Sequence, residues 1–180
     1  TASLRQFSGK TRKKIRCETD RLNARGVSFR YDHLADVDWL FRLNLEAFRG
    51  DSYFSDPRFL NAFEDLVIWL QNHDLLRVTS VLVGGQLAAV DIGAVWNGTY
   101  TVVAGGTGRD FPGIAKLINF HHLEWACRQQ LREVDFLCGE FNWKNRFHLT
   151  PRPLYKMSKF VTIEGAGAPV YASDMIYAAG

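Results

Sequence analysis

The stretch TYTVVAGGTGRDFPGIAKLINFHHLEWACRQQLREVDFLCG, residues 99–139, decides how we interpret the fold. It begins with a run of β-branched and small residues, TYTVVAGGT, and ends with a short apolar run, EVDFLCG. Between these runs, residues 113 to about 130 carry apolar side chains at helical spacing. A strand, a helix and a strand in this order predict a parallel strand pair joined by a right-handed crossover.

The start of this helix lacks a capping side chain, because Gly113, Ile114 and Ala115 stand where Ser or Asp is favoured. Pro112 sacrifices no hydrogen bond there, since the first N–H groups of a helix have no partner within the helix. A bare backbone at a helix start can hold a phosphate group. A tight turn without any ligand explains the same residues, and the local sequence leaves both interpretations open.

Two turn signals precede this stretch. Gly84-Gly85 and Asn97-Gly98 separate three runs of β-branched or small residues, over 75–83, 86–96 and 99–107. Both dipeptides favour tight hairpin turns. The sequence therefore predicts a three-stranded antiparallel meander directly before the crossover helix.

The first half of the chain indicates three helices and one strand. Ser8 can cap the first helix, which stops at Gly26, and Asp56 followed by Pro57 starts the third. We expect helices over 8–26, 34–48 and 56–73 and a strand over 27–31. After residue 139 we expect a short helix over 142–148, at least one strand over 153–165, and a loop and tail beyond it.

The size and composition of the chain suit one domain over residues 1–180. With 180 residues, 47% of them hydrophobic, it can bury a core of its own. No run approaches ~18 consecutive apolar residues, so no transmembrane helix is predicted. The start has neither an initiator Met nor an apolar leader, so we interpret the chain as a piece of a longer protein or as a trimmed one.

The cysteines and the charges bear on metal binding, on the location of the protein and on its binding partners. Cys17, Cys127 and Cys138 are far apart and form no CxxC pair, which argues against a zinc site and indicates a reducing, cytoplasmic location. The net charge is only +3, but basic side chains gather between Lys10 and Arg25. This segment is either a solvated helix face or a binding surface, and no nucleic-acid-binding signature accompanies it.

The order of these elements resembles the GNAT superfamily of N-acetyltransferases, and more narrowly the acetyltransferase domain of CelD-like and FemAB-like proteins. The resemblance runs from about Phe7 to Lys159. It is carried by the basic helix SGKTRKKIRCETDRL, the hairpin VLVGGQLAAVDIGAVWNGTYTVVAGG, the helix start PGIAKLI and the motif VDFLCGEFNWKNRF. In that family the last motif commonly reads DF-x-x-G-x-x-x-YK. Asp135, Phe136, Gly139 and Lys144 match it, whereas Trp143 replaces the Tyr.

The resemblance implies an α/β (α+β) fold of the GNAT acyl-CoA N-acyltransferase type. Its central sheet is mixed and mostly antiparallel, is flanked by helices, and contains a parallel strand pair that splays apart. Acetyl-CoA or another acyl-CoA would lie in the gap, with its pyrophosphate on the start of the following helix. The donor-binding residues implied are Val103, Ala104 and Gly105 on the strand and Phe111, Pro112, Gly113, Ile114, Ala115 and Lys116 at the helix start.

Acyl transfer to an amine needs a base that removes a proton from the nitrogen. Glu140, directly after the last predicted strand, is the first candidate, and an exposed loop carboxylate is the alternative. Asp91 interrupts an apolar strand, so it either positions the amine or is exposed on the outer face. Trp143 cannot supply the proton that a Tyr supplies in relatives. Lys144 would stabilise the departing thiolate or bind an anionic acceptor, and a surface lysine is the alternative.

Four further residues are candidates for substrate binding. Tyr53 and Phe54 lie in a break between helices, where this fold commonly builds its acceptor pocket, and Asp135 and Trp143 belong to the last motif. His121 and His122 point about 100° apart on a helix, so we expect one in the core and one in solvent, and no metal site. For Cys138, a small buried residue is favoured over a nucleophile.

The leading functional hypothesis is an acyl-CoA-dependent N-acyltransferase. Its acceptor would be an amine of a sugar, a polysaccharide precursor or a small metabolite. One alternative is FemAB-like transfer of an aminoacyl group from tRNA to a cell-wall precursor, which the basic first helix would suit. Another is a non-catalytic binding module with the same fold. The oligomeric state stays unassigned.

Overall fold

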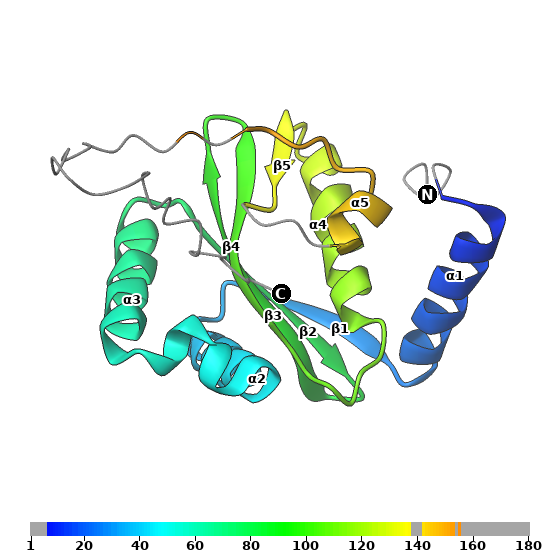
Figure 1. The fold of residues 1–180 in the computed structure, drawn as a ribbon, viewed down its shortest axis with the longest axis horizontal. Coiled ribbons are helices and arrows are strands. Elements are labelled where there is room, and N and C mark those ends of the chain that lie inside the picture. The colour runs from blue at the N-terminus through cyan, green and yellow to red at the C-terminus, as the bar shows by residue number, and fades with distance from the viewer. Residues whose placement is uncertain (1–6, 138–141, 154, 156–180) are drawn as a thin grey trace, which may run out of the picture. The chain divides into compact units, whose positions relative to one another are not determined.

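The structure is a computed structural model that describes residues 7–137, 142–153 and 155. The chain divides into two compact units, Thr1–Leu137 and Cys138–Gly180, and each is described by itself. The first unit contains the sheet and the helices α1 to α4 (Figure 1). In the second, the described residues form one short helix, α5 (Asn142–Arg146), as the sequence predicts.

A five-stranded sheet organises the first unit, with the strands in the order β1-β2-β3-β4-β5. Neighbours among the first four strands are antiparallel, and β5 is parallel to β4. The mixed sheet flanked by helices confirms the expected fold class. The strands are β1 (Val27–Tyr31), β2 (Leu76–Val83), β3 (Gln86–Trp96), β4 (Thr99–Thr107) and β5 (Glu133–Asp135).

Both predicted hairpin turns are present. Gly84 and Gly85 have φ of +59° and +79°, and Asn97 and Gly98 have φ of +45° and +73°. Two successive residues with positive φ match the twist of the strands on either side. This geometry explains why the chain carries Gly-Gly and Asn-Gly at these two places.

The long helices begin where capping residues predict. In α1 (Gly9–Ala24) the Ser8 hydroxyl accepts the N–H of Thr11, and in α3 (Pro57–Asn72) the Asp56 carboxylate accepts the N–H of Arg58. Between them, α2 (Val37–Phe48) follows a 3₁₀ turn at Leu34–Asp36. Two more 3₁₀ turns, η3 (Arg49–Asp51) and η4 (Tyr53–Ser55), lead into α3. The fourth helix is α4 (Ile114–Arg128).

The sheet has a separate apolar layer on each face (Figure 1). On one face, α2 and α3 bury Leu40, Phe41 and Phe63 against Val78 and Ile92. On the other, Leu22 of α1 and Ile114 and Ile118 of α4 pack on β2 and β3. The crossover helix thus lies opposite α2 and α3, and a ligand beside β4 would have a helical layer on either side.

The last predicted strand is shorter than expected. We predicted strand over 133–139, but β5 ends at Asp135. The Asp135 carboxylate accepts the N–H of Leu137 at 2.8 Å, and Leu137 has φ of +56°. This local turn competes with strand pairing and ends β5. Cys138 and Gly139 lie outside the described residues, as does most of the strand expected over 153–165.

Within the part of the chain that the structure describes, no helix has the length and apolar character needed to cross a bilayer.

Candidate active site

The parallel strands β4 and β5 are paired over a short distance only. Thr99, Tyr100 and Thr101 of β4 lie opposite Glu133, Val134 and Asp135 of β5. Among the described residues, the rest of β4 pairs with β3 alone. One edge of β4 beyond Thr101 therefore has backbone groups that no strand of the described part takes up, as the predicted splay requires.

A β-bulge lies where this edge becomes open. Ile92 of β3 is opposite Ala104, and Gly93 is opposite Val102, so Val103 is the extra residue. A bulge bends its strand and re-aims the neighbouring groups. The predicted donor-binding residues Val103, Ala104 and Gly105 occupy this bent segment, and all three are half-buried.

The start of α4 has no side-chain cap. Gly113 has φ of +92°, a conformation that favours glycine, and Ile114 donates its N–H to the carbonyl of Phe111. The amides of Ala115 and Lys116 find no acceptor among the described residues. Two N–H groups therefore point out of the helix start, where the macrodipole favours an anion.

The predicted residues at this helix start divide into two kinds. Phe111 and Ile114 are buried in the apolar layer beneath α4, so their side chains anchor the turn. Pro112 and Ala115 are exposed and Gly113 is half-buried, so only backbone or small groups face outward at these positions.

A carboxylate that we did not predict lies at the same place. Glu18 of α1 brings its Oε2 to 2.5 Å from Nζ of Lys116, and a Cβ added to Gly113 would lie 3.0 Å from the Glu18 Cβ. Lys116 is therefore already ion-paired. The two partners are 98 residues apart in the chain, and no local signal in the sequence points to the contact.

Two polar residues on the opposite face of β4 were also missed. Asn44 of α2 donates its Nδ2–H to the carbonyl of Gly105 at 3.1 Å, and Ser52 donates to Asn44 Oδ1 at 2.8 Å. The Ser52 hydroxyl in turn accepts the N–H of Phe54. These hydrogen bonds attach the segment between α2 and α3 to the open part of β4.

The predicted acceptor-contacting aromatics lie in that segment. Phe54 is only 6% exposed, and its ring packs 4.8 Å from Phe41 and 5.2 Å from Phe63, measured between centroids. It is a core residue. Tyr53 is half-buried with its ring centroid 5.4 Å from that of Phe59, so it is the better placed of the two for an acceptor.

Asp91 faces α4 and is buried, which rules out the alternative that it is exposed on the outer face of the strand. It is 4% exposed and accepts a hydrogen bond from Nε2 of fully buried His122 at 2.8 Å. Thr79 and Gly105 are its neighbours across the sheet. The carboxylate therefore ties α4 to β3, and a role in positioning the amine stays a prediction.

Tyr100 lies next to this pair. A Cβ on Gly93 would overlap the Tyr100 ring, so the phenol fills the space above that glycine. Burial raises the pKa of the Tyr100 hydroxyl, and the nearby Asp91 carboxylate raises it further. Arg77 stacks 3.7 Å from the Trp125 ring, and burial lowers the pKa of its guanidinium. Asp91 and Arg77 thus belong to one polar layer beneath α4.

Of the two predictions for the adjacent histidines, the one for the core is confirmed and the one for solvent is wrong. His122 is in the core, as predicted for one of them. His121 is not free in solvent: it stacks on Phe29 with a centroid distance of 4.0 Å and lies 3.2 Å from the Tyr31 hydroxyl. Among the described residues, no group of three or more His, Cys, Asp or Glu side chains could hold a metal ion.

The remaining candidates are Glu140, Trp143, Lys144 and Asp135. Glu140 lies outside the described residues. Trp143 and Lys144 are on α5 in the second unit, where the Trp143 and Phe147 rings meet edge to face at 5.7 Å and Lys144 Nζ is 5.8 Å from the Trp143 ring. Asp135 ends β5 through its bond to Leu137. Their catalytic and binding roles stay predictions.

A family model described as an acetyltransferase (GNAT) domain matches residues 9–145, which is most of the chain. The protein therefore belongs to the GNAT acetyltransferase family, which uses acetyl-CoA as acyl donor, and the expectation of an N-acetyltransferase is confirmed. No curated protein sequence matches the chain significantly.

Several solved structures share the fold at low sequence identity. A GNAT family acetyltransferase from Brucella melitensis, in complex with acetyl-CoA, has a TM-score of 0.51 and 16% identity over 68% of this chain and 82% of its own. An aminoglycoside acetyltransferase from an uncultured soil metagenomic sample, in complex with trehalose, has a TM-score of 0.53 and 11% identity over 76% and 97%. The acetyltransferase AAC(6')-Iy, in complex with the bisubstrate analog CoA-S-monomethyl-acetylneamine, has a TM-score of 0.50 and 15% identity over 74% and 99%.

Proposed function

We propose that the protein transfers an acetyl group from acetyl-CoA to an amine of a sugar or another small polar molecule. The observation that carries this proposal is the combination of an open edge on β4 with an uncapped start of α4. The first would pair with the amide-containing arm of CoA, and the second would hold its diphosphate. Both belong to the continuous segment from Thr99 to Arg128.

The residues present fit this donor. Backbone groups of Val103 and Ala104 lie on the open, bulged part of β4, whereas the carbonyl of Gly105 is taken by Asn44. The free amides of Ala115 and Lys116 suit the diphosphate. When bound, acetyl-CoA supplies the thioester whose acetyl group is transferred. The choice between acetyl and longer acyl groups stays open in this proposal.

The charge distribution supports a cationic acceptor. Residues 32–74, which contain α2 and α3, carry nine acidic and three basic side chains. Most of these acids are exposed, and Glu46 in α2 and Asp51 in η3 lie between Asn44 and Ser52 in the chain, the two residues that attach this region to β4. An acidic surface raises the local concentration of protonated amines. Solved structures described as aminoglycoside acetyltransferases share the fold and support the same class of acceptor.

The reaction also needs proton transfer. The amine must lose a proton as its nitrogen attacks the thioester carbonyl, and the departing thiolate must gain one. We keep Glu140 as the proposed base. Lys144 is the proposed partner of the thiolate, because the indole N–H of Trp143 is too weakly acidic to transfer its proton.

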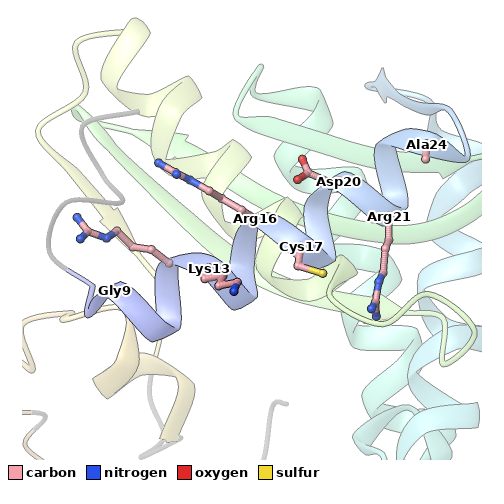
Figure 2. Close-up of a pocket in the computed structure, with 8 residues that line it drawn as sticks. Gly9, Lys13, Arg16, Cys17, Asp20, Arg21 and Ala24 are labelled. Carbon is pink, nitrogen blue, oxygen red and sulfur yellow. The ribbon is translucent and has the colours of Figure 1, made fainter.

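Within the family, we propose a CelD-like subtype from the motif residues Asp135, Phe136, Gly139 and Lys144. FemAB-like aminoacyl transfer is the second candidate because of the basic face of α1. There Arg12, Lys13, Arg16 and Arg21 lie along one open face of the helix (Figure 2). Exposed free thiols at Cys17 and Cys127 support the cytoplasmic location that we propose.

The deciding experiment combines binding and turnover. CoA should raise the melting temperature of the protein in a concentration-dependent way. Free thiol should then appear when acetyl-CoA is mixed with a panel of amino sugars and small amines. A requirement for aminoacyl-tRNA would favour the FemAB-like alternative. Absence of both a melting shift and thiol release would leave a non-catalytic binding module.

A further inference from the structure

Glu18 is an acidic side chain on a basic helix. Residues 9–25 carry seven basic side chains and only two acidic ones, Glu18 and Asp20. Asp20 lies on the exposed face with Lys13 and Arg16 (Figure 2). Glu18 instead faces α4, and its side chain is 20% exposed. The two acids therefore have different surroundings, and only Glu18 adjoins the candidate donor site.

The Glu18 carboxylate lies beside the open amides of α4 without capping them. Its Oε2 is 2.5 Å from Lys116 Nζ and would be 3.4 Å from a Cβ on Gly113. On its other side, Lys14 Nζ is 4.0 Å from Oε1. No side chain accepts a hydrogen bond from the N–H groups at the start of α4. A negative charge is thus already present where a diphosphate would bind.

The packing of α1 does not depend on this charge. Ile15 and Leu22 are buried, and Leu22 contacts the apolar layer that includes Ile114 and Ile118 of α4. Partly exposed ion pairs contribute little to stability. A neutral side chain of the same shape at position 18 should therefore leave the fold intact and change only the electrostatics of the site.

We propose that Glu18 sets the affinity of the donor site by competing with the diphosphate of CoA for Lys116 and the start of α4. This inference rests on the proposed function. Like charges repel at contact distance, so the pair between Glu18 and Lys116 must open when the diphosphate binds. Glu18 therefore weakens CoA binding, and Lys116 contributes its full attraction only once Glu18 is neutral or displaced.

The test is a double-mutant cycle on CoA binding, measured by titration calorimetry at neutral pH and low ionic strength. Glu18→Gln should bind CoA about tenfold more tightly than the wild type. Lys116→Met should change the dissociation constant by less than about twofold in the wild type but by roughly fivefold or more in the Glu18→Gln background. Circular dichroism and melting curves establish that each variant is folded.

Two controls test whether the effect of Glu18 on CoA affinity depends on the diphosphate. Asp20→Asn removes the same charge from the other face of α1 and should leave the dissociation constant unchanged. Pantetheine, which lacks the diphosphate, should bind wild type and Glu18→Gln equally. Weaker or unchanged CoA binding by Glu18→Gln, with a wild type that binds CoA, overturns the inference alone. No CoA binding by any variant overturns the inference together with the donor site of the proposed function.

Discussion

The imidazole of His121 is held in its neutral form by its surroundings. Burial lowers its pKa to about 4, and the neighbouring His122, Arg77 and Arg128 add to the effect. Stacking on Phe29 keeps the ring against the sheet. Protonation of this residue therefore opposes folding rather than assisting it.

A loss of stability at mildly acidic pH follows. In the unfolded chain the His121 imidazole titrates near 6.5, whereas in the folded protein it stays neutral down to about pH 4. Between these values the unfolded state binds more protons, so the free energy of unfolding decreases as the pH falls from about 6.5 to 4. We expect a loss on the order of 1 kcal/mol, because the ring is only partly buried.

Urea unfolding at several pH values measures this loss, and His121→Phe is the comparison. The variant keeps a ring on Phe29 but cannot titrate, so its stability should depend less on pH over the same window. Identical pH profiles for wild type and variant would contradict the assignment.

At the scale of single residues, the roles of helix caps and turn residues were the easiest to predict. Ser8, Asp56 and the turn glycines act on backbone groups within a few positions, so their roles follow from the sequence. The contact of Glu18 with Lys116 and that of Asn44 with Gly105 join residues far apart in the chain. Such contacts depend on how helices cross the sheet, and the local sequence carries no signal for them.

Among the elements, α4 is the one whose position matters most for the candidate site, and the bond between Asp91 and His122 attaches it to β3. Asp91→Ala would leave the fully buried His122 Nε2 without an acceptor. We expect this change to lower the free energy of unfolding by about 3 kcal/mol. Asp91→Asn retains an acceptor oxygen and should cost about 1 kcal/mol.

The measurement is urea unfolding, with Asp65→Asn on the exposed face of α3 as the matched control. This surface change should stay within about 0.5 kcal/mol of the wild type. If Asp91→Ala cost no more than Asp65→Asn, the pair would not be what attaches α4 to the sheet.

The existence of the α-helices and strands of the first unit was predictable from periodicity and turn signals, but the 3₁₀ turns and the end of β5 were not. The run EVDFLCG has the apolar pattern of a strand, but β5 ends at Asp135, whose carboxylate accepts the N–H of Leu137. Likewise, the extra residue at Val103 depends on the pairing register between β3 and β4. Register follows from tertiary packing, so the family resemblance indicated Val103, Ala104 and Gly105 for the open edge, but the bulge itself could not be predicted.

On the scale of the whole first unit, charge is strongly divided between the helices. Basic side chains dominate α1, and acidic ones dominate the segment with α2 and α3, which packs on the opposite face of the sheet (Figure 1). An anionic donor and a cationic acceptor would thus approach from different sides. The net charge of the chain is only +3, so this separation of acidic from basic side chains is a property of the fold and is not visible in the overall composition.

The acidic side should select for acceptors with several amino groups. Removing two charges with Glu46→Gln and Asp51→Asn should raise KM for an aminoglycoside about threefold to tenfold. KM for a monoamine such as glucosamine should change much less, and added salt should reduce the difference. Steady-state kinetics measure both.

The double variant Glu64→Gln and Asp65→Asn removes the same charge from the exposed face of α3 and serves as control. It should affect the two acceptors equally. Equal effects from both double variants would mean that only net charge matters and that the acceptor does not lie beside α2.

Because the Tyr100 ring occupies the space beside Gly93, the residue types at these two positions should depend on each other in evolution. A methyl group at position 93 would overlap the phenol, so Gly93 cannot acquire a side chain while position 100 keeps its large ring and the sheet keeps its spacing. Homologues with a larger side chain at position 93 should carry a smaller one at position 100. Covariation between these two columns of an alignment would then show the same packing in distant members of the family.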